Sequence, residues 1–177
     1  MGEELVSCVF EVAGWGWIGL VASERGVRGL ILPRKTREEA LAALREHHPQ
    51  TPLVERHPLL DEVQRQVTAY LEGELREFTV PVDLRGHTSF ALSVWSVSTQ
   101  IGYGETRAYR WIAEQIGGGG AGIYQAVGSA LGANPVPLII PCHRVVGSDG
   151  SLHGYAGGLD MKGRLLALES GQGFLAL

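Results

Sequence analysis

Apolar and polar residues alternate in short runs over residues 5–32, a pattern that predicts β-strands. The apolar positions are Val6, Cys8, Phe10, Val12, Trp15, Trp17, Leu20, Val27, Leu30 and Leu32. Two short glycine-containing segments, 14–16 and 23–26, separate the runs and have the composition of tight turns. Runs joined by such turns favour an antiparallel meander of three strands, with Cys8 on its apolar face.

Helical spacing replaces alternation after residue 35. The residues at 36–39, Thr-Arg-Glu-Glu, have the capping-box pattern, and alanines and leucines follow them at helical intervals. The helix should end near His47 and His48, which precede a proline. Neighbours on a helix do not share a face, so these histidines are expected to be solvated at the helix end rather than to bind a metal.

A second amphipathic helix is expected over residues 59–71, where apolar residues recur every four positions and Gly73 gives a stop signal. The apolar run 78–84 contains Pro81, which lacks a backbone donor. It is therefore an edge strand or an extended connector. A boundary between two domains, 1–86 and 87–177, is expected just after this run.

From residue 88 onwards the pattern is helical. Helices are predicted over 88–101, 107–116, 121–131 and 160–169. Four consecutive glycines, 117–120, join the second of these to the third. Helix, short glycine turn, helix is the arrangement of the helix-turn-helix motif, whose second helix enters a groove of DNA. Many helical hairpins bind nothing, so this pattern alone leaves the function open.

Between the last two helices, an apolar run bracketed by Pro137 and Pro141 leads directly into Cys142 and His143. The prolines exclude a central strand, and the apolar residues favour burial, so Cys142 is expected at the inner end of a pocket. A cysteine thiol beside a histidine can be a nucleophile, because the histidine raises the reactive thiolate fraction. The alternative is a buried cysteine that acts only as a small apolar residue.

Composition narrows the class of protein. The chain has 177 residues and a formal net charge of −4, with 45% hydrophobic and 19% charged residues, which suits a globular fold. Residues 1–90 carry 10 basic and 14 acidic side chains and residues 91–177 carry 5 of each, so the second half is neutral. No apolar run is long enough to cross a membrane, and two cysteines outside any zinc-like cluster give no disulfide framework or metal site. A cytoplasmic protein is expected.

A set of motifs in the second half points to one family. The strings are Pro141-Cys142-His143-Arg144-Val145-Val146, Gly154-Tyr155-Ala156-Gly157-Gly158, Tyr103-Gly104-Glu105-Thr106, Ala126-Val127-Gly128 and Asn134-Pro135, together with Tyr109, Lys162 and Glu169. Their order over residues 88–170 resembles the O6-alkylguanine-DNA alkyltransferases, also called methylated-DNA–protein-cysteine methyltransferases. The resemblance implies an α/β (α+β) fold: a ribonuclease H-like three-stranded antiparallel sheet with helices as a scaffold, then a mostly helical winged helix-turn-helix domain.

The resemblance also implies a reaction and roles for named residues. The protein would repair DNA by moving an alkyl group irreversibly from O6-alkylguanine, or from O4-alkylthymine, to its own Cys142. His143 would act as the base through a water molecule, and Glu169 would orient it. Asn134 would hold the active-site turn, and Tyr109 would protonate the departing guanine.

Further residues would bind the flipped base and the duplex. Val145, Tyr155, Ala156 and Gly157 would bind the base, and Arg110, Gln125, Ala126, Gly128 and Ser148 would contact DNA. The second helix of the hairpin would lie in the minor groove. Gln125 stands where the family usually has an arginine that inserts into the base stack, Ala156 replaces a common serine, and the glycine turn is about two residues longer than usual. No cofactor and no obligate protein partner are expected, and the protein should be a monomer bound to double-stranded DNA.

Three other functions use parts of the same pattern. A Cys-His hydrolase would use Cys142 and His143 but would turn over repeatedly. An alkyltransferase-like DNA-binding protein would recognise the lesion without removing it, but such proteins lack the cysteine that is present here. A transcription factor is disfavoured by the small number of basic residues.

Overall fold

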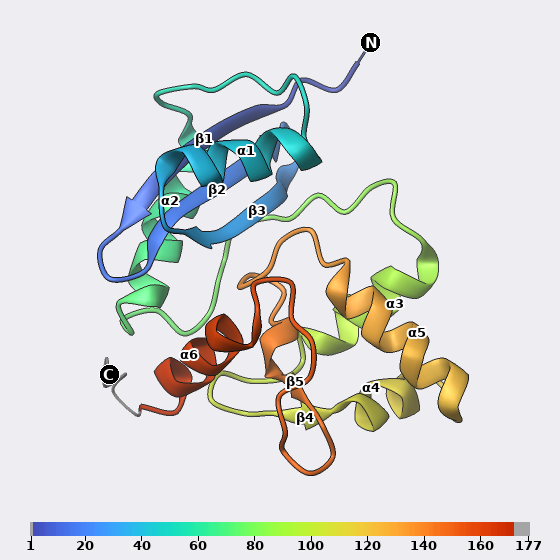
Figure 1. Ribbon diagram of the computed structural model, residues 1–177. Helices are drawn as coiled ribbons and strands as arrows, with labels where there is room; N and C mark the ends of the chain where they lie inside the picture. The colour runs from blue at the N-terminus through green and yellow to red at the C-terminus, as the bar shows by residue number, and fades with distance from the viewer. Residues whose placement is uncertain (1, 172–177) are drawn as a thin grey trace. The chain divides into compact units, whose positions relative to one another are not determined.

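The computed structural model describes residues 2–171. Residue 1 and residues 172–177, which were assigned above to the ends of the two domains, lie outside the described part. The chain divides between Arg85 and Gly86 into two compact units, and both can be followed in Figure 1.

The first unit contains the predicted three-strand antiparallel meander. Its elements are β1 (Val6–Val12), β2 (Gly16–Ser23), β3 (Gly26–Arg34), α1 (Arg37–His47) and α2 (Pro58–Leu71). The sheet order is β1-β2-β3, with Cys8 opposite Leu20. Cys8 is only half-buried, whereas the neighbouring Ser7 is buried and donates to the backbone of Pro52. The alternation of apolar residues predicted that Cys8 is buried, and the structure shows it only half-buried.

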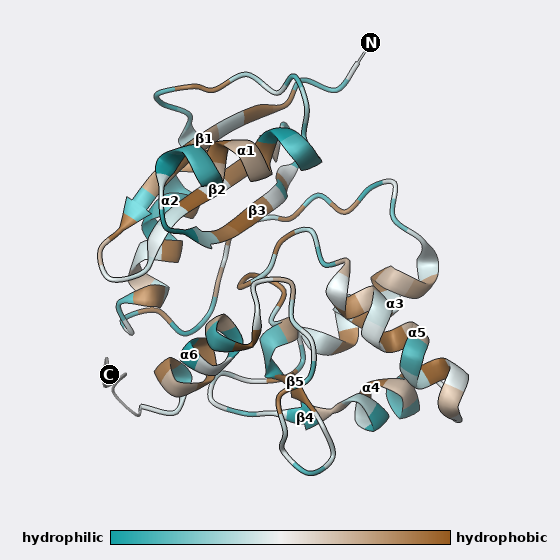
Figure 2. Cartoon of the chain, in the orientation of Figure 1, coloured by the Kyte–Doolittle hydropathy of each residue, from teal (hydrophilic) through white to brown (hydrophobic). Residues whose placement is uncertain are grey.

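One helix covers each face of this sheet (Figure 1). Val21 and Ile31 pack against Leu44 of α1. Because side chains alternate along a strand, Ile18 and Leu20 point to the opposite face, towards α2. Figure 2 shows that the hydrophobic residues of α1 lie in the middle of the helix and the hydrophilic ones at its ends.

Local signals explain the helix ends of this unit. The hydroxyl of Thr36 accepts from the backbone of Glu39, as the capping pattern predicts. His47 is exposed, but the expectation of solvation is wrong for His48, which is half-buried. The His48 ring occupies the space above Gly29, where a Cβ atom would lie 2.5 Å from Nε2. Burial lowers the pKa of His48.

The run 78–84 is an extended connector with a single bridge, between Val82 and Val27. The buried carboxylate of Asp83 accepts from the hydroxyl of Ser23 at 2.6 Å and pairs with Arg28 and Arg85. This ion cluster holds the end of the first unit in place.

The second unit is mostly helical. Its elements are α3 (Ser89–Ser98), β4 (Arg107–Ala108), α4 (Tyr109–Gln115), α5 (Ala121–Gly132), the 3-10 turn η1 (Cys142–Arg144), β5 (Val145–Val146) and α6 (Leu159–Glu169). The indole nitrogen of Trp95 on α3 donates to the carbonyl of Ala130 on α5 at 2.8 Å, in a buried hydrogen bond. No helix within residues 2–171 is long and apolar enough to cross a membrane.

One helix begins later than the spacing predicts. Arg107 and Ala108 were expected to be helical, but they form β4, which pairs in parallel with Val145 and Val146. Those backbone hydrogen bonds commit the two residues to an extended conformation, so α4 begins at Tyr109. The pairing brings Tyr109 next to the strand that follows the Cys-His turn.

Candidate active site

Asn134 holds the segment that carries the cysteine. Its side-chain oxygen accepts from the backbone N–H of Val136 at 3.0 Å, and its side-chain nitrogen donates to the carbonyl of Ile140 at 2.9 Å. The same nitrogen donates to Sγ of Cys142 at 3.1 Å. One side chain therefore closes the turn before the cysteine and also contacts the sulfur.

The turn between these contacts contains an unusual backbone conformation. Leu138 has a φ of 72°, in the left-handed region that residues with a Cβ rarely occupy, and it is buried. Such a conformation costs on the order of 1–3 kcal/mol and persists only where surrounding contacts enforce it. Here the N–H of Ile140 donates to the carbonyl of Val136 at 3.0 Å, which closes the turn around Leu138.

His143 and Glu169 form a buried pair behind the cysteine. Nε2 of His143 lies 2.8 Å from Oε1 of Glu169, and His143 has no exposed surface. Arg144 also binds Glu169, with Nε 2.9 Å from Oε2 and Nη2 2.8 Å from Oε1. An arginine remains charged in proteins, so it favours the ionised carboxylate. An ionised Glu169 can only accept, which places the ring proton of neutral His143 on Nε2 and leaves Nδ1 as the basic nitrogen.

Burial keeps both reactive groups neutral at rest. It raises the pKa of the Cys142 thiol to about 12, although the hydrogen bond from Asn134 and the charge of Lys162 act in the opposite direction. Burial also lowers the pKa of His143, against the raising effect of Glu169. At neutral pH the site thus holds a thiol and an imidazole that is able to accept a proton.

Lys162 is part of the family motif, but no role was predicted for it from the sequence. In the structure it supplies a buried positive charge to the site. Its side chain is 1% exposed, and Nζ donates to the carbonyl of His153 at 3.0 Å. The ammonium also lies 5.9 Å from the centre of the Tyr109 ring. Lysine is seldom fully buried without a charged partner, and a developing thiolate at Cys142 would be such a partner.

A cavity of about 930 Å³ opens beside this cluster. Seven of the predicted site residues line it: Tyr109, Arg110, Gln125, Gly128, Ser148, Tyr155 and Ala156. Cys142, His143, Val145 and Glu169 are buried, Asn134 is half-buried, and none of these five forms the cavity wall. Ala126 and Gly157 are half-buried and also lie outside the lining.

Two tyrosines connect the cavity to the sulfur. Burial and the charge of Cys142, in that order, raise the pKa of Tyr109. Burial, Cys142 and Glu169 raise the pKa of Tyr155. Both tyrosines line the cavity, and the charge of Cys142 contributes to the raised pKa of each. Both also keep their protons at neutral pH and can donate hydrogen bonds.

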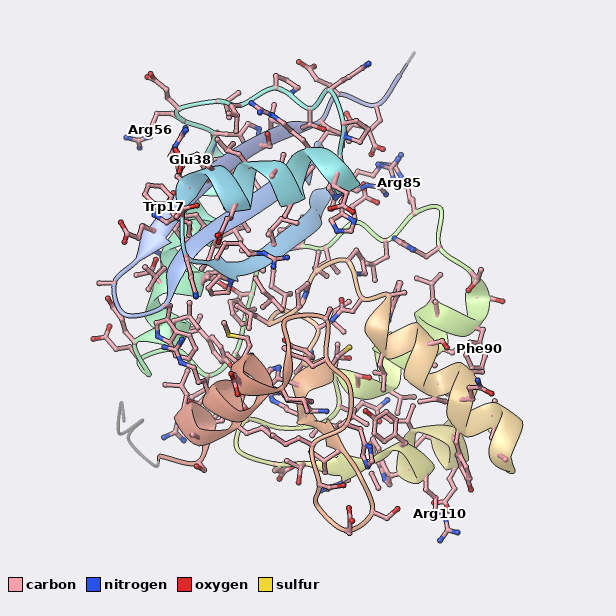
Figure 3. The ribbon with its side chains drawn as sticks, viewed as in Figure 1. Trp17, Glu38, Arg56, Arg85, Phe90 and Arg110 are labelled. Atoms are coloured by element: carbon pink, nitrogen blue, oxygen red, sulfur yellow. The ribbon has the colours of Figure 1, made fainter. Side chains whose placement is uncertain are left out.

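The mouth of the cavity is formed by α4, α5 and the loop after β5. Arg110 on α4 is exposed, points into solvent (Figure 3) and hydrogen-bonds the side chain of Tyr124. Gln125 follows on α5 and is exposed. In the loop, the side chain of His153 lies over Gly147, and a Cβ atom at Gly147 would lie 2.5 Å from its Nε2, so a larger residue there would displace that side chain. The residues that the structure describes contain no group of three side chains able to hold a metal ion.

Fold and site together define a two-unit α+β protein in which a buried cysteine and a buried His-Glu pair lie in the same unit as the helical hairpin of α4 and α5. Residues 89–171 match the family model described as the DNA-binding domain of 6-O-methylguanine DNA methyltransferase. The inducible methylated-DNA–protein-cysteine methyltransferase of Bacillus subtilis is 43% identical over 156 residues, which cover 86% of this chain and 84% of that protein. The methylated-DNA–protein-cysteine methyltransferase of Mycolicibacterium paratuberculosis is 55% identical over 104 residues, 59% of this chain and 61% of that protein.

A solved structure resembles both units. The crystal structure of Mycobacterium tuberculosis OGT in complex with DNA matches 94% of this chain and 93% of that one, with 37% identity and a TM-score of 0.76. The chain belongs to the family of methylated-DNA–protein-cysteine methyltransferases. The α+β fold expected from the resemblance is confirmed.

Proposed function

We propose that the protein repairs DNA by transferring an alkyl group from O6-alkylguanine, and from O4-alkylthymine, to its own Cys142. The observation that carries this proposal is the placement of Sγ. The sulfur accepts from Asn134 at 3.1 Å and lies in the same turn as His143, which pairs with the buried Glu169 of α6. The named relatives and the DNA complex of a homologue support a substrate in DNA.

The transfer needs a thiolate, and the site can form one at the moment of reaction. Nδ1 of His143 takes the thiol proton through a water molecule, while Glu169 stabilises the imidazolium that results. The sulfur attacks the alkyl carbon, a C–S bond forms and the C–O6 bond breaks. The departing guanine accepts a proton from the hydroxyl of Tyr109, which its raised pKa keeps protonated.

Backbone groups around the cavity would recognise the base. The carbonyls of Cys142 and Val145 would accept from its exocyclic amine, and the N–H of Ala156 would donate to O6. The Cys142 carbonyl already accepts from the N–H of Val145, so the base would use its second lone pair. The ring of Tyr155 would form a flat wall, and Gly157, two residues further on, would bind the base from outside the cavity lining.

The damaged nucleotide must leave the duplex to reach this cavity, at a cost of a few kcal/mol. In the proposal α5 lies in the minor groove, where Ala126 and Gly128 allow close approach of the backbone and Gln125 replaces the flipped base. Arg110 and Ser148 bind the DNA backbone. Of the basic side chains in this unit, Arg144 and Lys162 are buried, which leaves few charges for phosphates. Modest affinity with a shallow salt dependence is therefore expected.

The product, S-alkylcysteine, is a thioether that water does not readily hydrolyse, so each molecule should act once. We assign the chemistry and the DNA contacts to the second unit, 87–177 in the sequence-based division, and a scaffold role to residues 1–86. The protein should work as a monomer, without cofactor or obligate protein partner. Both cysteines are free thiols, and the nucleophile must stay reduced, which fits the cytoplasm.

A titration tests the proposal. Increasing amounts of duplex containing O6-methylguanine are added to a fixed amount of protein, and the repaired guanine is counted. The expected plateau is one repaired base per protein molecule, with none for Cys142→Ser. Repeated turnover would indicate a hydrolase and would refute the proposal.

A further inference from the structure

The hydroxyl of Tyr155 is a buried donor without a hydrogen-bond partner among residues 2–171. Neighbouring polar groups at the site are engaged: Asn134 binds three groups, and Lys162 binds a carbonyl. Buried hydroxyls in proteins are nearly always paired, and exceptions often mark groups that bind something during function. Tyr155 also lines the cavity, although its hydroxyl oxygen is itself buried.

During catalysis, negatively charged groups act on this hydroxyl. The Tyr155 ring packs edge-on against His143, with ring centres 6.5 Å apart. Burial is the largest cause of the raised pKa of Tyr155, and the charges of Cys142 and Glu169 raise it further. The phenol therefore keeps its proton throughout the working pH range. It can donate a hydrogen bond to a nearby anion but cannot compete with His143 as a base.

The thiolate at Cys142 needs such a donor. Cys142 is only 5% exposed, so the anion forms with little access to solvent. Asn134 donates one hydrogen bond at 3.1 Å, and Lys162 contributes a charge whose own hydrogen bond goes to the carbonyl of His153. A buried anion is stabilised most by fixed donors that point to where its charge develops.

We propose that Tyr155 is a further catalytic residue, whose hydroxyl donates a hydrogen bond to the Cys142 sulfur as the thiol loses its proton. This deepens the proposed function and rests on it for the natural substrate. The proton passes from sulfur to Nδ1 of His143, the phenol keeps its own proton, and the sulfur lone pair forms the new C–S bond. Tyr155 thus has two functions, since its ring forms the cavity wall and its hydroxyl acts on the nucleophile.

The test compares Tyr155→Phe with the wild-type protein and with Tyr70→Phe. Tyr70 is a buried tyrosine of the first unit, so its variant controls for loss of a buried hydroxyl away from the site. Each protein is methylated with methyl iodide across neutral and alkaline pH, a reaction in which the C–S bond forms and iodide leaves. Methyl transfer from an O6-methylguanine duplex and the unfolding midpoint are measured in parallel.

Loss of a preorganised donor to a developing anion slows reactions by about a hundredfold or more in oxyanion sites. The charge of a thiolate is more diffuse than that of an oxyanion, so its hydrogen bonds are weaker. We therefore expect the methylation rate of Tyr155→Phe to fall on the order of tenfold. The loss should be similar with methyl iodide and with DNA, and the pH at which methylation accelerates should rise. The unfolding midpoint should stay the same or rise, since no partner is lost. Tyr70→Phe should keep the wild-type methylation rate and pH profile.

Two outcomes would overturn this role. Tyr155→Phe could keep the wild-type rate and pH profile with methyl iodide, or it could be slow only with DNA, which would mean that the hydroxyl serves the base. Failure of the proposed function looks different: the wild-type protein would react with methyl iodide but not with the duplex. The methyl iodide comparison would still decide the role of the hydroxyl.

Discussion

Asn134 donates a hydrogen bond to the sulfur of Cys142 at 3.1 Å, and the same side-chain amide binds the backbone on both sides of the turn. The cysteine and the turn that carries it therefore depend on one residue. No other residue type offers a donor and an acceptor of this size and shape.

Two substitutions of Asn134 test these roles. In Asn134→Asp the side chain can still accept from Val136, but a negative charge replaces the donor to the sulfur. We expect a loss of roughly tenfold or more in the rate of methyl transfer, as for other donors to a developing anion. Both variants should lose about 1–3 kcal/mol of stability, because the carbonyl of Ile140 loses its side-chain donor in each. Asn134→Ala should lose more, because the N–H of Val136 then also loses its acceptor. Single-turnover kinetics and denaturant unfolding measure the two effects. Equal rates in wild type and Asn134→Asp would contradict this assignment.

Arg144 should matter for stability as much as for chemistry. Its guanidinium binds Glu169 and donates to the carbonyl of Ile101 at 2.6 Å, all in a buried site. In Arg144→Met the carboxylate loses its permanent counter-charge, which typically costs about 3–5 kcal/mol for a buried pair. Denaturant unfolding checks this loss. The exposed pair of Arg65 and Glu62 gives the matched control, since Arg65→Met should change stability little. A loss no larger in Arg144→Met than in Arg65→Met would contradict the prediction.

The rate of methyl transfer should depend on pH through His143. Burial lowers the pKa of this residue from the usual 6.5, so the imidazole is neutral at pH 7 and is protonated only at lower pH. The rate should therefore stay constant as the pH falls to 6.5 and decrease below it. Folding stability should decrease over the same acidic range, because the unfolded chain takes up the proton at the higher pKa. A rate that halves at or above pH 6.5 would refute this reading of the site.

Gln125 is expected to limit DNA binding. It lies exposed at the mouth of the cavity on α5, in a unit with few exposed cations. Gln125→Arg adds a charge and a planar group that can fill the space of a flipped base. Duplex affinity and repair rate should both rise, and the salt dependence of log K should steepen by about 0.9 for one new phosphate contact. Fluorescence anisotropy at several salt concentrations provides the measurement. Unchanged affinity and rate would show that position 125 does not contact DNA.

Alkylation should destabilise the protein. The methyl group would enter a site where Cys142 is 5% exposed, and overpacking of this kind costs about 1–3 kcal/mol. The thermal midpoint should therefore drop after reaction with an O6-methylguanine duplex. The midpoint of Cys142→Ser, treated in the same way, should not change. A higher midpoint in the methylated wild type would contradict the expected overpacking.

The sequence predicts those elements whose signals are local. The meander, the capped helix at Thr36 and the extended run around Pro81 follow from alternation, capping residues and a missing donor, and they lie where expected. The motif around Cys142 likewise indicated the chemistry. These features depend on residues close to one another in the chain.

Features that depend on distant parts of the chain were not predictable in this way. The two-residue strand β4 exists only because Val145 and Val146 lie beside it. The burial of Lys162 depends on the carbonyl of His153 and on the Tyr109 ring, and the left-handed Leu138 depends on contacts of Val136 and Ile140. In each case tertiary contacts override the preference of the residue itself.

The central claim is that the sulfur of Cys142 keeps the alkyl group. Intact-mass spectrometry after reaction with an O6-methylguanine duplex, followed by peptide mapping, tests it most directly. We expect one added methyl group per molecule, on the peptide that contains Cys142, with Cys8 unmodified as an internal control. A repaired duplex together with an unmodified protein, or a methyl group on any residue other than Cys142, would contradict it.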